Sequence, residues 1–180
     1  MFTNLETVDA TSTQYIKAGV HQVKITKIES SKASNPNANT PYIDFHMETV
    51  SGSLGKARLF GDREGQTPEA ANFKAKMLKR LLMAAGVTDF KDYAVACKQT
   101  VGKKLTAVFA TREYWTNDKD GNPVIKSIAD YKFPAKIDEE ITFEESWNKT
   151  LSPEDLRSFN DAKEMAGQST TTKVVDDMPF

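Results

Sequence analysis

The chain has 180 residues, of which 39% are hydrophobic and 27% charged, and its formal net charge is −1. This length favours one domain with appendages, and because no run of about 18 apolar residues occurs, the sequence predicts no membrane-spanning helix. The lone Cys97 excludes an internal disulfide, and the first residues lack the basic and apolar regions of a signal peptide, so we expect a cytoplasmic protein.

The small net charge hides an asymmetry between the two parts of the chain. Residues 1–136 carry 20 basic and 14 acidic residues, a balance of +6, whereas residues 137–180 carry 4 basic and 11 acidic residues, a balance of −7. Residues 56–112 contribute most of the positive excess, with 12 basic and 5 acidic residues. A moderately basic body with an acidic extension is typical of a polyanion-binding domain with an interaction tail, although an ordinary solvated surface has a similar balance.

Three strands are expected after a loose lead-in over residues 1–18. Residues 19–29 and 41–48 alternate apolar and polar side chains, the period of a strand with one buried face, and residues 56–60 continue the pattern. The polar run 30–40 and the glycine-containing run 51–55 predict the two connecting loops. Together these segments predict a three-stranded meander.

A helix is expected next, because Thr67 supplies a hydroxyl N-cap, Pro68 takes the first helical position and Gly86 is placed to end it. Its apolar face is formed at steps of three and four residues by Phe73, Met77, Leu78, Leu81, Leu82 and Ala85. Residues 89–96 are expected to add a short second helix. The β-branched and aromatic run 105–115 and residues 124–133 predict two further strands, joined by a hairpin loop over 117–123.

This order of elements predicts a mainly β protein with an OB-fold, a five-stranded Greek-key barrel whose helix lies between the third and fourth strands. Other α+β arrangements share the same order of elements. We expect residues 1–150 to form this OB-fold domain, within which residues 134–150 wrap the outside through Ile141, Phe143 and Trp147. Residues 151–166 are expected to form a short helix, and residues 167–180 a flexible tail with an acidic tip.

The sequence gives little support to catalysis. His21 and His46 fall on different expected strands, and no Cys/His/Asp spacing resembles a zinc site. His46 stands beside Asp44 and Glu48, which could accept a divalent ion, but exposed strand residues are the simpler interpretation. Cys97 has no histidine base near it, which favours a buried structural thiol. We therefore expect no enzyme activity, no cofactor and no resident metal.

Binding of a single strand requires cations that track the phosphates and aromatic faces on which bases stack, at roughly 1–3 kcal/mol for each stacked base. The aromatic candidates are Tyr42, Phe60, Tyr114, Trp115, Tyr131 and Phe133. The candidate phosphate contacts are Lys24, Lys27, Arg58, Lys103, Lys104, Arg112, Lys126 and Lys132. The pair formed by Arg112 and Tyr114 is the strongest, because both lie on one face of a long expected strand.

Aromatic residues of a small barrel are more often core than stacking platforms. We expect about half of the six rings to be buried. The rings of Phe45, Phe73 and Phe109 are assigned to the core.

The last five residues, Asp176-Asp177-Met178-Pro179-Phe180, combine two carboxylates with an apolar end and a terminal aromatic ring. Pro179 restricts its own φ and disfavours helix at the residue before it, so the end is expected to stay extended. The small polar run 167–173 precedes it as a flexible leash. A partner protein could bind such a hook with an apolar pocket and basic side chains.

This tip resembles the Asp-Asp-Ile-Pro-Phe end of bacterial single-stranded DNA-binding proteins, with Met178 in place of the isoleucine. The resemblance implies an OB-fold body that holds single-stranded DNA and a tip that recruits proteins of DNA replication, recombination and repair. The strand pattern that begins Gly19-Val20-His21-Gln22-Val23-Lys24-Ile25 is more similar to the single-stranded DNA-binding proteins of bacteriophages, which would act in the cytoplasm of a bacterial host.

Two other classes of protein fit the same features. One is a phage annealing or recombination-mediator protein, which binds single strands and actively pairs them. The other is an interaction module that binds no nucleic acid and uses its sheet for protein contacts. The sequence is compatible with a monomer or a small homo-oligomer.

Overall fold

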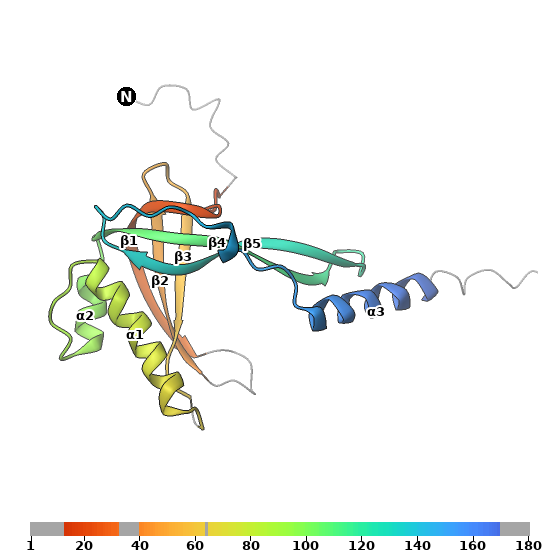
Figure 1. Cartoon of the computed structure of the whole chain (residues 1–180), viewed down its shortest axis with the longest axis horizontal. Coiled ribbons are helices and arrows are strands. Elements are labelled where there is room, and N and C mark those ends of the chain that lie inside the picture. Colours follow the sequence, from red (N-terminus) through yellow and green to blue (C-terminus); the bar gives the residue numbers. More distant parts are fainter. Residues whose placement is uncertain (1–12, 33–39, 64, 170–180) are drawn as a thin grey trace, which may run out of the picture.

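The computed structural model describes residues 13–32, 40–63 and 65–169 of the chain. The protein is mainly β, with one five-stranded antiparallel sheet in the order β3-β2-β1-β4-β5 (Figure 1). The strands are β1 (Gly19–Lys32), β2 (Pro41–Thr49), β3 (Leu54–Phe60), β4 (Lys104–Asn117) and β5 (Pro123–Ala135). The five expected strands and the early meander are confirmed, and β1, β4 and β5 extend past their expected ends.

The core lies on the face of the sheet where the apolar residues of the alternating strands point. Phe45, Met47 and Ile25 are fully buried there, together with Phe109 of β4. A β-bulge between Ile25 and Lys27 shifts the register of β1, and Ile28 consequently packs against the same core. The expected burial of Phe45, Phe109 and Cys97 is confirmed.

Helices α1 (Pro68–Ala84) and α2 (Tyr93–Gln99) follow β3 and lie together at one end of the sheet (Figure 1). The Thr67 hydroxyl accepts a hydrogen bond from the Ala70 amide at 3.3 Å, as expected for the N-cap. Gly86, with φ +78°, follows the end of α1. The second helix begins at Tyr93 because the Asp92 carboxylate accepts from the amides of residues 94 and 95 and so sets its N-terminus.

The assignment of Phe73 to the core is wrong, because this side chain is 65% exposed. The buried side of α1 is formed further along the helix, where Leu81 and Leu82 are buried and Leu78 packs against the core. The first turns of α1 extend beyond the sheet (Figure 1), so the apolar period continues past the part of the helix that the sheet covers.

Strands β4 and β5 continue beyond β1 as a two-stranded extension, which we call the ribbon (residues 110–117 and 123–130). The pairing of β1 with β4 ends where Gly19 meets Phe109, whereas β4 and β5 stay paired out to Asn117 and Pro123. Figure 1 shows the ribbon projecting away from the rest of the sheet. Of the helices in the described part of the chain, none has the length and apolar character needed to cross a membrane.

Residues 136–149, which belong to the expected wrapping segment 134–150, run back along the sheet toward the ribbon (Figure 1). The Trp147 ring meets the rings of Phe133 and Phe143 edge to face, with centroids 5.0 and 5.6 Å apart. Lys149 exchanges backbone hydrogen bonds with Thr111 and Glu113 of β4. This segment therefore occupies part of the β4 edge that β1 leaves unpaired.

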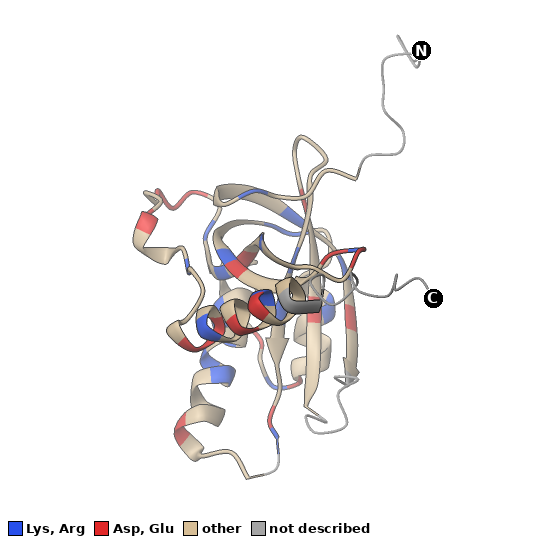
Figure 2. Ribbon diagram, turned by 90° about the vertical axis from the view of Figure 1, so that its right-hand side faces the viewer, with Lys and Arg blue, Asp and Glu red and all other residues tan. Residues whose placement is uncertain are grey.

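Helix α3 (Pro153–Ser169) lies along the ribbon, where the rings of Phe159 and Trp115 meet edge to face at 6.5 Å. It carries four carboxylates and two cations along its length (Figure 2). The helix includes residues 167–169, which the sequence had assigned to the flexible tail. Propagating a helix adds one hydrogen bond for each residue that is fixed, so a short polar run without proline does not have to end it.

Candidate nucleic-acid interface

Three strands present one continuous polar face on the side of the sheet away from the core. We call it the outer face, and it comprises Lys24, Lys27, Glu29, Tyr42, Asp44, His46, Glu48, Lys56, Arg58 and Phe60. The strand register aligns its members in cross-strand rows: Lys27 with His46 and Lys56, Glu29 with Asp44 and Arg58, and Tyr42 with Phe60. Cations and rings from three separate sequence segments therefore lie side by side.

Asp44 is the centre of this face. Its side chain is only 6% exposed, and its carboxylate accepts hydrogen bonds from Arg58 Nε at 2.8 Å, Arg58 Nη2 at 2.7 Å and Lys56 Nζ at 3.1 Å. Burial alone raises the pKa of Asp44, but the hydrogen bonds from Arg58 and Lys56 outweigh it and hold this pKa below its ordinary value. Asp44 thus remains ionised and fixes the positions of two cations.

The Arg58 guanidinium also lies over an aromatic ring. Its central carbon is 4.0 Å from the centroid of the Tyr42 ring, and the Tyr42 and Phe60 rings meet edge to face at 6.3 Å. Phe60 is 49% exposed. A planar guanidinium and an exposed ring next to each other offer two surfaces on which nucleobases can stack.

Glu29 links the remaining polar groups of the outer face. One carboxylate oxygen accepts from the His46 imidazole at 2.8 Å, and the other forms an ion pair with Lys27. The hydrogen bonds from Lys27 and His46 hold the pKa of Glu29 below its ordinary value. Among the described residues no group of three metal-binding side chains occurs, so His46 is placed as a hydrogen-bond partner of Glu29.

Two further predicted lysines border the outer face at the start of β4, opposite the middle of β1. Lys104 lies directly opposite Lys24 in the β1–β4 register, and the backbone carbonyl of Lys103 accepts from the Ile25 amide at 3.0 Å. Lys24, Lys103 and Lys104 are exposed, and within the described ranges none of them forms an ion pair. They extend the positive charge of the outer face.

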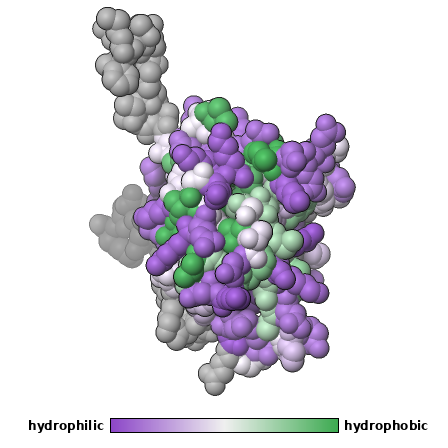
Figure 3. Space-filling view, turned by 90° about the vertical axis from the view of Figure 1, so that its left-hand side faces the viewer, coloured by the Kyte–Doolittle hydropathy of each residue, from purple (hydrophilic) through white to green (hydrophobic). Residues whose placement is uncertain are grey.

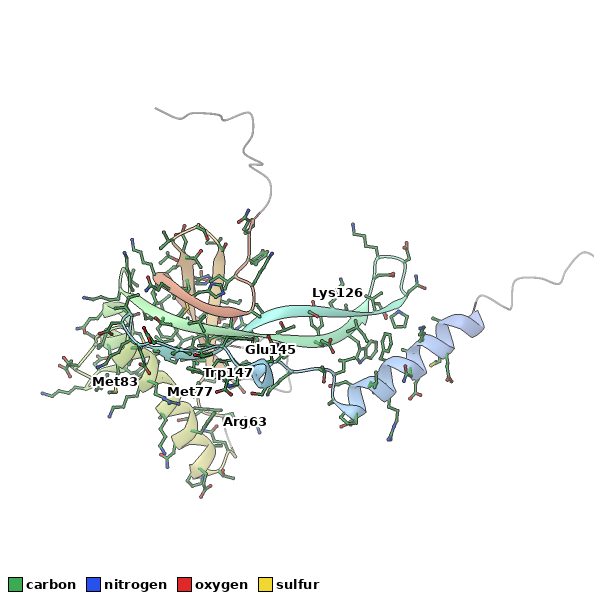
Figure 4. All side chains as sticks on the ribbon, turned by 45° about the horizontal axis from the view of Figure 1, so that its top comes forward. Arg63, Met77, Met83, Lys126, Glu145 and Trp147 are labelled. Atoms are coloured by element: carbon green, nitrogen blue, oxygen red, sulfur yellow. The ribbon has the colours of Figure 1, made fainter. Side chains whose placement is uncertain are left out.

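The other predicted cations lie on one side of the ribbon. We call this side the ribbon face, and it comprises Arg112, Tyr114, Lys126, Ile128, Asp130 and Lys132. Tyr114 pairs with Lys126 across the strands, and Arg112 Nε donates to Asp130 at 2.8 Å. Partial burial and the neighbouring Lys149 lower the pKa of Lys132. Figure 4 places Lys126 out along the ribbon, and Trp147 with Glu145 nearer its base.

Three predicted stacking residues, Tyr131, Trp115 and Phe133, lie away from both faces. Tyr131 packs against the core, with its ring 6.0 Å from that of Phe109. Burial raises the pKa of its hydroxyl, which has no hydrogen-bond partner among the described residues. The prediction that Tyr131 stacks on bases is therefore corrected, because a β5 residue opposite Phe109 must face the core. Trp115 lies on the α3 side of the ribbon, and alternation separates it from Tyr114.

The expectation that about half of the six candidate rings are core residues is also wrong. None of these six rings is fully buried, and Tyr131 alone among them packs against the core cluster. Phe133 packs instead on Trp147 of the wrapping segment.

Sequence reasoning missed the part that Asp44, Lys56 and Glu29 play in this face. Asp44 and Glu29 lie opposite each other in the β1–β2 register, and Asp44 lies opposite Arg58 in the β2–β3 register. The signal available was an aspartate on the polar side of a strand that would pair with a strand bearing Lys56 and Arg58. Whether these residues contact one another depends on the register of the three strands, which the loop lengths did not define.

Comparison with models of protein families found no match, and comparison with curated proteins found none either. The predicted partner-binding residues Asp176, Asp177, Met178, Pro179 and Phe180 lie outside the described residues. The resemblance of the tip to single-stranded DNA-binding proteins therefore rests on the sequence alone.

Proposed function

We propose that this chain binds single-stranded DNA with little sequence preference and functions in DNA replication, recombination or repair. The observation that carries the proposal is the arrangement of Arg58, Tyr42 and Phe60 side by side on the outer face, next to a series of lysines. Stacking and phosphate contacts do not read base edges, so such a face binds any sequence.

The proposal includes an OB-fold body. The chain order of three strands, helix and two strands supports it, as does the sheet order β3-β2-β1-β4-β5. Residues of the two edge strands, β3 and β5, also approach one another, as the closure of a barrel requires. The outer face would then be the outside of the first three barrel strands.

A titration of fluorescent oligo-dT at several salt concentrations tests the proposal. We expect binding that weakens steadily as salt rises, because each neutralised phosphate releases counterions. Duplex DNA of the same length should bind more weakly, since its bases are not free to stack. Absence of oligo-dT binding at low salt, or equal binding of duplex, would contradict the proposal. An assay with an added complementary strand separates a protein that only holds single strands from one that anneals them.

We also propose that the acidic tip recruits a replication or repair protein, on the strength of its resemblance. The variant Phe180→Ala keeps both carboxylates and removes the terminal ring, so we expect unchanged DNA binding and loss of partner binding. The measurement is a pull-down from bacterial lysate with wild-type and variant protein. Recovery of the same proteins by both would contradict the role of the tip.

A further inference from the structure

A groove of about 870 Å³ opens between the ends of the first three strands and the two helices that follow them. Its floor is apolar and is formed by Ile28, Ile43 and Leu59 from the strands, Leu78 from α1 and Cys97 from α2. The described residues therefore leave the core incompletely covered at this end. Figure 3, which views the molecule from the side of α1 and α2, shows apolar side chains gathered among hydrophilic ones on this face.

The groove and the outer face meet at the ends of β2 and β3. Tyr42 and Phe60, which end the outer face, also line the groove. On the opposite side the mouth is lined by Tyr93, whose side chain is 65% exposed at the start of α2. Phe60, which presents a ring on the outer face, and Tyr93 are thus both among the residues that line the groove.

The rim of the groove carries positive charge. Lys98 of α2 is exposed at the rim, and Lys74 of α1 is held there by the Gly61 carbonyl at 2.6 Å and the Gln66 side chain at 2.7 Å. Among the described residues, the lining includes one carboxylate, Asp62. Cations at a rim above an apolar floor match a ligand with phosphates on one side and flat, largely apolar rings on the other.

We infer that the groove is a second nucleobase-binding subsite, into which a single strand continues after it crosses the outer face. This inference rests on the proposed function. The observation that selects nucleic acid as the occupant is that Tyr42 and Phe60 belong to both surfaces. A strand that follows the outer face to its end reaches the groove without leaving aromatic contact.

The test is a length series of oligo-dT from about 4 to about 16 nucleotides, the range of sites for OB-folds. Affinities are measured for the wild type, Tyr93→Ala and Lys98→Gln. Val95→Ala and Lys91→Gln are the matched controls, because both residues are exposed near or on the same helix and neither lines the groove. Circular dichroism verifies that each variant is folded.

We expect Tyr93→Ala to weaken binding of the longest oligonucleotides by about 5-fold to 150-fold, the range for one lost stacking contact. The shortest oligonucleotides, which the outer face alone can hold, should bind Tyr93→Ala and wild type equally. Lys98→Gln should lower the salt dependence for long oligonucleotides only. The two control variants should behave as wild type at every length.

Two results would overturn the inference while leaving the proposed function intact. The first is equal binding of long oligonucleotides by Tyr93→Ala and wild type, while Phe60→Ala weakens binding at all lengths. The second is that the groove binds a peptide instead of DNA. A synthetic peptide of residues 176–180 would then bind the protein, Tyr93→Ala would abolish that binding, and the affinity of Tyr93→Ala for DNA would not change. Failure of the wild type to bind any oligonucleotide contradicts the proposed function itself.

Discussion

The outer face and the ribbon face contain the same chemical groups, an arginine paired with an aspartate beside a tyrosine, yet they differ in what lies behind them. Behind the outer face the same strands bury Phe45, Met47 and Ala57 in the core. The ribbon is two strands wide and is supported by α3 and by residues 148–149. A two-stranded segment by itself is marginally stable in water.

The difference is clearest in the two arginine–aspartate pairs. The Asp44 side chain is 6% exposed and receives both Arg58 and Lys56, whereas Asp130 is 43% exposed and receives Arg112. An ion pair between exposed groups contributes little, because water and salt screen it and ordering two side chains costs entropy. The comparison indicates that burial of one partner makes the outer face the better ordered surface.

The largest effect is expected for Phe60→Ala. We expect the free energy of binding to oligo-dT to become less favourable by roughly 1–3 kcal/mol, because one stacking surface is lost. Phe60 is 49% exposed, so the thermal midpoint of unfolding should change little. The matched control is Phe73→Ala, which removes an exposed ring from α1 and should leave oligo-dT affinity unchanged. Equal losses in both variants would show that the outer face has no special part in binding.

The next effect concerns stability. Asp44→Asn should lower the free energy of unfolding by about 1–2 kcal/mol in urea titrations, because hydrogen bonds to a charged, buried group are lost. Asp130→Asn should lower it by less than about 0.5 kcal/mol. If both variants lose the same stability, the contrast in burial between the two pairs has no energetic consequence.

Acid should remove the contribution of Asp44. The folded-state pKa of Asp44 is lowered from an ordinary value of 3.8, so its stabilisation is fully present above that value and is lost as pH falls through the folded-state pKa. The stability difference between wild type and Asp44→Asn should therefore be constant at neutral pH and shrink below about pH 3.8. Urea titrations at a series of pH values measure it, and a difference that grew on acidification would reverse the assigned sign.

A smaller effect is expected for Tyr114→Ala on the ribbon face. The ring stands opposite Lys126 on strands with no core behind them, so we expect a loss of about 1 kcal/mol in oligo-dT affinity, at the low end for a stacked ring. The fold should be retained, because the side chain is not in the core. A loss larger than that of Phe60→Ala would make the ribbon face the principal binding surface. Reduced stability with unchanged affinity would assign the Tyr114 ring a packing role.

The smallest effect is expected in the salt dependence. Lys24→Gln should reduce the slope of log affinity against log salt by about 0.7, the value for one phosphate contact on a single strand. Arg112→Gln should reduce it by less, because the Arg112 guanidinium already pairs with Asp130. Equal changes in the two variants would indicate that the Asp130 pair opens to let Arg112 reach phosphate.

Local patterns predicted most of the elements. The Thr67 cap and Pro68 set the start of α1, and the alternation in residues 41–48 placed Phe45 and Met47 in the core and Asp44 and His46 outside it. The wrong assignments arose where the tertiary contacts of a residue did not follow from its local pattern. Phe73 continues the apolar period of α1 past the sheet, and Tyr131 belongs to the core because of the residue it pairs with on β4.

The candidate site was predictable as a set of residues but not as a surface. Lys24, Lys27, Tyr42, Arg58 and Phe60 were all expected from their types, yet they come from three strands whose mutual register depends on the bulge in β1 and the turn after β2. A shift of one residue would send every side chain of a strand to the other face. The contacts of Asp44 with Lys56 and Arg58 follow from that register.

By itself the sequence determined which segments are strands and helices, which side of each strand is apolar, and how charge divides between the body and the C-terminal part. These properties depend on periods of two and about 3.6 residues and on caps, all of which are local. The tertiary structure decided which polar strand faces adjoin, that Asp44 is buried among cations, that Trp115 packs on α3, and that a groove remains between the strand ends and α1. These depend on contacts between residues far apart in the chain, whose geometry follows from packing and register and is not encoded in any short stretch of residues.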